Sequence, residues 1–160
     1  MSNSDPYGWS EDLSSGITLI DNQHKEIMVV INDLLAHVSG DELKEKEYFV
    51  HVIQKTMHKI RIHFVTEEKI LRLIKYSAYV DHKRAHDALI MNIVDSIREF
   101  EAGKKLSLSS FAEILKHWLV PHIEEKDKPY FRYIRQIATR KENGKLSITA
   151  DDVFNSRKEP

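Results

Sequence analysis

The sequence predicts an all-α protein, arranged as an antiparallel up-down-up-down four-helix bundle. Its 160 residues include only five glycines and four prolines, so few positions would interrupt a helix. Apolar residues recur every three or four positions, and no segment alternates apolar and polar residues as a half-buried strand does. The connections between helical segments are short, which makes successive helices antiparallel neighbours.

Two helical segments are predicted in the first half of the chain. The first spans about 20–37, with Asp21 as the expected N-cap and Gly40 just beyond its end. The second spans about 41–76, where apolar residues from Phe49 to Leu71 recur at helical spacing. Each segment has one apolar face that a bundle can bury.

Two further helices are predicted in the second half. One spans about 79–102 and is ended by Gly103. The other begins after the serine cluster near 107–110, which offers N-cap oxygens, and runs to about 140. Pro121 lies inside this last helix, where it removes a backbone donor, so we expect a local bend.

We expect residues 1–140 to form one domain, because a chain of this length can bury a full core without disulfides. Residues 141–160 are predicted to be a polar C-terminal tail. Thr149 and Asp152 match a capping box for one helical turn there, although a frayed tail is the favoured interpretation.

The composition excludes several classes of function. The 24 basic and 25 acidic residues leave no positive excess for binding nucleic acid or anionic lipid. No apolar run is long enough to span a membrane, and the first ten residues lack a signal-peptide pattern, so a cytoplasmic protein is expected. The absence of cysteine excludes thiolate zinc sites and iron–sulfur clusters. Any metal must therefore use nitrogen and oxygen ligands, and the nine histidines are the compositional oddity.

Histidines and carboxylates recur at spacings that place them on one helix face. His63 with Glu67, and His82 with His86, are four residues apart and so form side-by-side pairs. His24 lies near the start of the first predicted helix. A single pair of this kind arises readily by chance in a histidine-rich helical protein, so the prediction rests on the whole set.

The fourth predicted helix contributes His122 and Asp127, which are five residues apart. They share a helix face only loosely, and this placement suits a carboxylate that reaches two ions lying side by side. All four helices thus supply at least one group to the same bundle core. Such a cluster needs a metal or close pairing to offset its desolvation.

The ligand count predicts an open coordination position. Two octahedral ions offer about twelve positions, of which five imidazoles and two bridging carboxylates fill about nine. One bridging oxygen takes two more, so a single position remains open on one ion. The ligand types favour iron over magnesium or calcium and leave zinc and manganese as alternatives.

Several segments resemble the motifs of the hemerythrin family. They are GITLIDNQH at 16–24, HFVTEE at 63–68, the pair His82 and His86, WLVPHI at 118–123, and Asp127. The resemblance extends over about 9–133. It implies a hemerythrin-like domain with a non-haem di-iron centre, bridged by oxide or hydroxide, that binds dioxygen reversibly and is not an enzyme.

The resemblance also implies a role for each matching residue. One iron ion would be bound by His82, His86 and His122. The other, with the open position, would be bound by His24 and His63, and both ions would be bridged by Glu67 and Asp127. Four apolar residues match the family's dioxygen pocket, and each is also compatible with core packing: Ile27, Phe64, Trp118 and Leu119.

The chain departs from the family pattern in a few places. Ser77 occupies a position where many relatives have proline, and Pro121 occupies a variable position of the fourth-helix motif. Four histidines match no ligand position and are expected at the surface or in packing: His37, His51, His58 and His117. Of these, His58 and His117 are the two candidates for groups that support a ligand from outside the coordination sphere.

Three other functions are alternatives to a dioxygen carrier that supplies an oxygen-consuming client protein. A ferritin-like di-iron enzyme is disfavoured, because no histidine here has a glutamate three positions before it. The hemerythrin fold with a role in sensing, iron storage, nitric oxide handling or repair of iron centres stays open. The third alternative is a helical interaction module whose site is incidental or filled by zinc.

Overall fold

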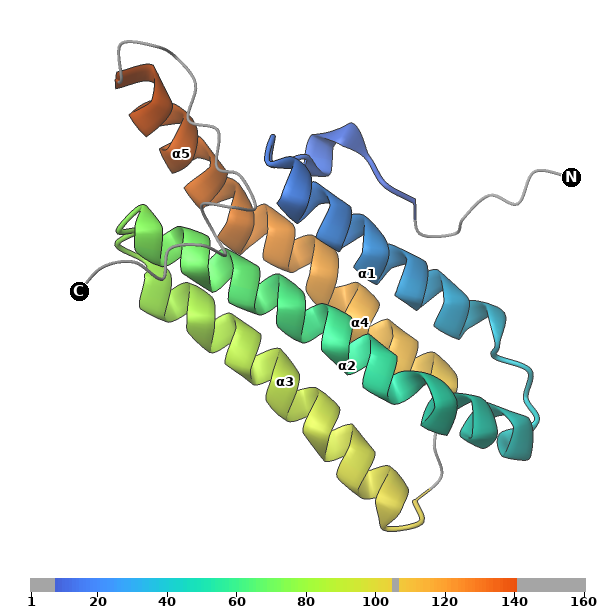
Figure 1. Ribbon diagram of the computed structural model, residues 1–160. Coiled ribbons are helices and arrows are strands. Elements are labelled where there is room, and N and C mark those ends of the chain that lie inside the picture. The colour runs from blue at the N-terminus through green and yellow to red at the C-terminus, as the bar shows by residue number, and fades with distance from the viewer. Residues whose placement is uncertain (1–7, 105–106, 141–160) are drawn as a thin grey trace, which may run out of the picture.

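The computed structural model describes residues 8–104 and 107–140, and its regular structure is helical (Figure 1). Three long helices come first: α1 Thr18–Ala36, α2 Glu42–Leu73 and α3 Tyr79–Glu101. The fourth rod has three consecutive segments: α4 Leu108–His122, η2 Ile123–Asp127 and α5 Lys128–Arg140. The only other regular element is the short 3-10 turn η1 Glu11–Leu13, and no strand occurs within these described ranges. The predicted all-α four-helix bundle is confirmed.

The four rods pack around a common interior. α1 contacts both α2 and α4, and α3 also contacts both α2 and α4. Figure 1 shows α5 continuing the direction of α4. The buried apolar residues form two clusters: a larger one that includes Ile31, Phe49, Ile93 and Leu115, and a smaller one that includes Ile20, Leu71, Tyr130 and Phe131. Among the described residues, no helix is both long enough and apolar enough to cross a membrane.

The first helix begins earlier than predicted, and Asp21 does not cap it. α1 starts at Thr18, with Ile17 in the N-cap position. The buried Asp21 carboxylate accepts hydrogen bonds from the Ser14 hydroxyl at 2.7 Å and from the Ser15 N–H and hydroxyl at 2.7 and 2.6 Å. The prediction was wrong because Asp21 uses its oxygens on the preceding loop, so it anchors that loop to the helix.

The other helix boundaries lie close to their predicted positions. Asp41 caps α2 by accepting a hydrogen bond from the Lys44 N–H, and Ser107 caps α4 in the same way. Gly40 and Gly103 follow α1 and α3 with φ values of 76° and 78°, a conformation that glycine adopts without strain. The predicted capping box of Thr149 and Asp152 lies outside the described residues.

The single fourth helix of the prediction is interrupted by a π-helical turn just after Pro121. In η2 the Lys128 N–H bonds to the carbonyl of Ile123, five residues earlier. Pro121 has no N–H to donate to the preceding turn, which loosens the α-helical hydrogen-bond pattern at this point. The disturbance expected at Pro121 thus takes the form of a wide turn, a feature that is frequent at functional sites.

The contacts of Asp21 generate a first prediction. We expect Asp21→Ala to lower the free energy of unfolding by about 2 kcal/mol, because the partly buried hydroxyl of Ser14 and the buried donors of Ser15 lose a charged acceptor. The measurement is urea unfolding of chelator-treated protein, so that metal binding does not contribute. Asp12→Ala, at an exposed position of the same segment, is the control and should change this value by less than about 0.5 kcal/mol. Equal losses in the two variants would contradict the anchoring role of Asp21.

Candidate metal centre

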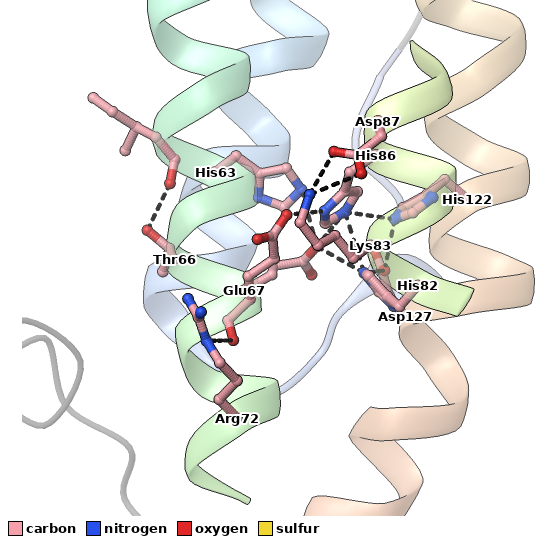
Figure 2. Close-up of polar contacts among 12 residues, drawn as sticks. His63, Thr66, Glu67, Arg72, His82, Lys83, His86, Asp87, His122 and Asp127 are labelled. Carbon is pink, nitrogen blue, oxygen red and sulfur yellow. Dashed lines mark hydrogen bonds and ion pairs between the residues drawn. The ribbon is translucent and has the colours of Figure 1, made fainter. Parts of the chain in front are cut away.

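The seven residues predicted as metal ligands converge inside the bundle. They come from all four rods: His24 from α1, His63 and Glu67 from α2, His82 and His86 from α3, and His122 and Asp127 from the fourth. Each is at most 4% exposed to solvent. Figure 2 shows the side chains from α2, α3 and the fourth rod turned toward one another.

Buried apolar side chains pack on both sides of this polar cluster along the bundle. On α1, for example, His24 lies between Ile20 of the smaller apolar cluster and Ile27 of the larger one. On α2, His63 and Glu67 lie between Ile60 of the larger cluster and Ile70 of the smaller one. The polar residues are therefore held in an apolar surrounding, where an unpaired charge is expensive.

The ligand atoms form two groups that share the Glu67 carboxylate. One group contains Glu67 with His82, His86 and His122, and the other contains Glu67 with His24 and His63. Within each group the ligand atoms lie within 4.8 Å of one another. The Oε2 atom of Glu67 is 3.3 Å from His82 Nε2, 3.2 Å from His86 Nε2 and 3.5 Å from His63 Nε2. Glu67 thus lies where a carboxylate can contact both groups.

Asp127 also faces both groups, one with each oxygen. Its Oδ1 atom is 3.1 Å from His122 Nε2 and 3.4 Å from His82 Nε2, whereas its Oδ2 atom is 3.3 Å from His24 Nε2. In an α-helix, residues five apart are rotated by about 140° from one another. The π-helical turn η2 adds the extra width that brings His122 and Asp127 onto one face.

The cluster has the polar atoms that a pair of metal ions requires. Among the described residues, His24 Nε2, His63 Nε2 and both Asp127 carboxylate oxygens are buried without a hydrogen-bond partner. Buried polar atoms normally have partners, so a set of facing lone pairs fits cations placed between them. Imidazole and carboxylate ligands without thiolate fit iron, zinc or manganese.

The electrostatics of the site keep its ligands in metal-binding form. Burial lowers the pKa of His63 to about 3 and also lowers the pKa of His122, so both imidazoles are neutral at physiological pH. Burial alone would raise the pKa of Glu67, but its interactions with the His63, His82 and His86 imidazoles hold it well below its usual value. Neutral imidazole and ionised carboxylate are the protonation states that bind metal.

His24 and His86 differ from these two histidines. Burial opposes the charge of His24 as well, but its hydrogen bond with Asp127 and the charge of that carboxylate raise its pKa. Burial also opposes the charge of His86, but hydrogen bonds to Glu67 and Glu68 outweigh burial and raise the pKa of His86 to about 9. The two bonds join His86 Nε2 to Glu67 and His86 Nδ1 to Glu68, the latter at 3.3 Å. A proton on His86 is thus the positive charge that a metal ion would displace.

Three residues that contact the ligands were not predicted as part of the site. Tyr130 donates a hydrogen bond to Glu67 Oε1 at 2.5 Å, Glu68 contacts His86 Nδ1, and Gln23 Oε1 is 3.4 Å from His63 Nδ1. The sequence places Tyr130 only on an apolar helix face. Its position three residues after Asp127 is the signal that could have identified it. Gln23 and Glu68 are each adjacent in sequence to a ligand, but adjacent helical residues do not share a face.

The four residues predicted to line a dioxygen pocket are buried or partly buried near the cluster. The Phe64 ring stacks on His86 with centroids 3.8 Å apart, and the Trp118 ring stacks on His122 at 4.2 Å. These aromatic rings therefore lie against imidazoles of the three-histidine group. Ile27 and Leu119 belong to the larger apolar cluster, and their role at an open position stays a prediction.

The four histidines that match no ligand position are exposed, as predicted: His37, His51, His58 and His117. His117 Nδ1 contacts the carbonyl of Glu113 at 2.9 Å, on its own helix. His58 lines a surface pocket together with Lys55 and Lys59. The idea that His58 and His117 support the ligands from outside is wrong, because their side chains lie at the surface.

Comparisons with known proteins agree with this arrangement. The family model described as Hemerythrin HHE cation binding domain matches residues 15–134. A bacteriohemerythrin of Pseudomonas aeruginosa is 31% identical over 151 residues, which cover 91% of this chain and 96% of the relative. A bacteriohemerythrin of Stenotrophomonas maltophilia is 32% identical over 123 residues, 76% of this chain and 77% of the relative. The myohemerythrin of Sipunculus nudus is 28% identical over 127 residues, 79% of this chain and 92% of the relative. No solved structure matches the chain significantly.

The hydrogen bond between Tyr130 and Glu67 generates a second prediction. We expect Tyr130→Phe to lower the free energy of unfolding by about 1.5 kcal/mol, because a buried carboxylate loses a donor. Chelator-treated protein is unfolded in urea, and Tyr133→Phe, on the exposed side of α5, should leave the value within about 0.5 kcal/mol of wild type. An unchanged stability of Tyr130→Phe would mean that this bond does not hold Glu67.

Proposed function

We propose that this chain, which belongs to the hemerythrin family, binds dioxygen reversibly at a pair of non-haem iron ions. The observation that carries the proposal is the meeting of five imidazoles in two groups that share the Glu67 carboxylate, with a second carboxylate, Asp127, facing both groups. Unpartnered ligand atoms inside an apolar surrounding support metal ions there, and the family supports iron.

The two groups suggest how the ligands are divided. We assign His82, His86 and His122 to one ion and His24 and His63 to the other, with Glu67 and Asp127 bridging them. The second ion has fewer protein ligands, which supports an open coordination position on it. When bound, the iron pair supplies the electrons that reversible dioxygen binding requires.

The surrounding side chains favour binding without further chemistry. The two apolar clusters exclude water from both sides of the site. The Tyr130 hydroxyl donates to Glu67, and burial together with the Glu67 charge raises the pKa of this phenol well above its usual value. Tyr130 therefore keeps its proton instead of supplying an acid to a bound ligand.

A carrier differs from the other roles of this fold in a measurable property. Sensing, iron storage, nitric oxide handling and repair of iron centres would use the same ligands, but only a carrier must return to the same state after many cycles of oxygenation. We further propose the cytoplasm as its location and an oxygen-consuming protein as its client.

The proposal predicts about two iron ions per chain and a reversible visible charge-transfer band. The band should appear in air, disappear when oxygen is removed under argon, and return with the same amplitude over repeated cycles. The measurements are metal analysis of purified protein and optical spectra under air, argon and dithionite. Colourless protein that contains zinc, or one iron ion per chain after reconstitution, would contradict the proposal.

A fourth prediction tests whether Leu119 guards the open position. Leu119 is fully buried and lies one helical turn before His122. We expect Leu119→Asn to bind dioxygen but to lose the oxygenated band about tenfold faster, because asparagine admits water and offers a proton donor. A tenfold change corresponds to about 1.4 kcal/mol in the barrier.

Leu115→Asn is the matched control, since Leu115 is also buried in the larger cluster but lies one turn farther from the ligands. Both variants place an amide in the core, so a general loss of packing would affect them alike. The decay of the band is followed in air at fixed pH and at equal iron content. Equal decay in the two variants would remove Leu119 from the dioxygen pocket.

A further inference from the structure

A chain of three hydrogen-bonding groups joins α1 to α2 behind one of the predicted ligands. The Thr66 hydroxyl donates to the carbonyl of Ile62 at 2.8 Å (Figure 2). The Gln23 side-chain Nε2 donates to Thr66 Oγ1 at 3.1 Å, and Gln23 Oε1 is 3.4 Å from His63 Nδ1. Thr66 and His63 are both fully buried, and Gln23 is partly exposed.

The direction of each bond in this chain follows from the number of protons available. A hydroxyl has one proton, and Thr66 uses it on the Ile62 carbonyl, so Thr66 Oγ1 can only accept from Gln23. Gln23 must then turn its NH₂ group toward Thr66 and its oxygen toward His63. An amide oxygen accepts only, so the proton of the neutral His63 ring must be on Nδ1.

We propose that Gln23 and Thr66 are positioning residues that fix the tautomer of His63 and leave its Nε2 lone pair free for a metal ion. Thr66 sets the orientation of the Gln23 amide, and Gln23 determines which ring nitrogen of His63 carries the proton. The inference rests on the proposed metal centre, in which His63 is one of the two histidines of the ion with the open position.

The need for Thr66 comes from the chemistry of an amide. An amide presents an acceptor on one side and a donor on the other, and rotation by half a turn exchanges them. With the amide reversed, an N–H would face His63 Nδ1 and favour the tautomer whose proton is on Nε2, which cannot bind metal. The Glu68 carboxylate beside His86 has acceptors only and requires no orienting partner.

Gln23 also separates His63 from solvent. On its outer side it lines a surface pocket of about 290 Å³ together with Lys55, Lys59 and Ile62. The Nδ1 proton of His63 therefore has Gln23 between it and this pocket. Its exchange with water reports directly on whether the amide is held in place.

The test uses the full-length protein loaded with Zn²⁺, which is diamagnetic and accepts the same ligand types. Nitrogen-15 labelling of histidine identifies the protonated nitrogen of His63 by NMR, and competition with a chelator gives the affinity for the weaker zinc ion. Wild type should bind two zinc ions and show an Nδ1–H signal for His63. Thr66→Val should lower the affinity for the more weakly bound zinc ion about tenfold, as loss of an outer hydrogen-bond partner typically does. It should also accelerate exchange of the His63 Nδ1 proton with water.

A matched control separates positioning from general stability. Thr56 is another buried threonine of α2, and its hydroxyl donates to the Val52 carbonyl four residues earlier at 3.1 Å. Thr56→Val removes the same kind of bond away from Thr66, Gln23 and His63, so the zinc affinity and the His63 Nδ1–H signal should match wild type. Thr66→Ser keeps the hydroxyl and should also behave as wild type.

A rescue variant makes the test specific to amide orientation. In Gln23→Glu/Thr66→Val the side chain at position 23 has acceptors on both sides, so it accepts from His63 without help from Thr66. Zinc affinity and the Nδ1–H signal should recover to near wild type in this double variant. The positioning role would be overturned if Thr66→Val matched Thr56→Val, or if the double variant behaved like Thr66→Val. Failure of wild type to bind two zinc ions would instead count against the metal centre itself.

Discussion

The burial of two carboxylates among five imidazoles is the constraint on which the rest of this structure depends. Charges removed from water must be compensated locally, and no single helix can supply all of the groups that do so. Each rod therefore contributes at least one ligand, and the apolar residues of each rod are divided between two clusters on either side. The bundle is thus organised around a polar layer that a conventional core would not contain, and the apolar packing keeps the seven side chains in register.

The convergence of these side chains was predictable from sequence because their spacing reflects local geometry. Residues four apart share a helix face whatever surrounds them, so His63 with Glu67 and His82 with His86 were paired before any tertiary information. Helix limits were also close, since glycine and capping residues act locally. Asp21 shows where this reasoning fails: a carboxylate near a helix start can accept from its own helix or from the preceding loop. Which donors it uses depends on how Ser14 and Ser15 are placed.

The fourth rod shows a different limit of sequence reasoning. Pro121 predicted an irregularity in the helix, but its presence did not specify whether the helix would kink, end or widen. The π-helical turn places Asp127 where one oxygen faces His24 on α1 and the other faces His122 on its own rod. An α-helical turn is the lower-energy arrangement of an isolated chain, so contacts across the bundle select the wider turn. The five-residue spacing between these two ligands is consistent with the π turn and would be awkward in a straight helix.

The groups behind the ligands were the least predictable part of the site, because they pair residues from different helices. His86 has the Glu68 carboxylate behind its Nδ1, whereas His63 has the neutral amide of Gln23. A negative charge behind an imidazole makes that imidazole a stronger donor to a metal, and an amide does so less. The three-histidine group therefore has both more ligands and a more strongly polarised one. The two halves of the cluster thus differ in two properties, the number of imidazoles and the groups behind them. Both properties make the three-histidine half the stronger donor set. We therefore expect an exogenous molecule to meet the least competition from the protein at the half with fewer and less polarised side chains.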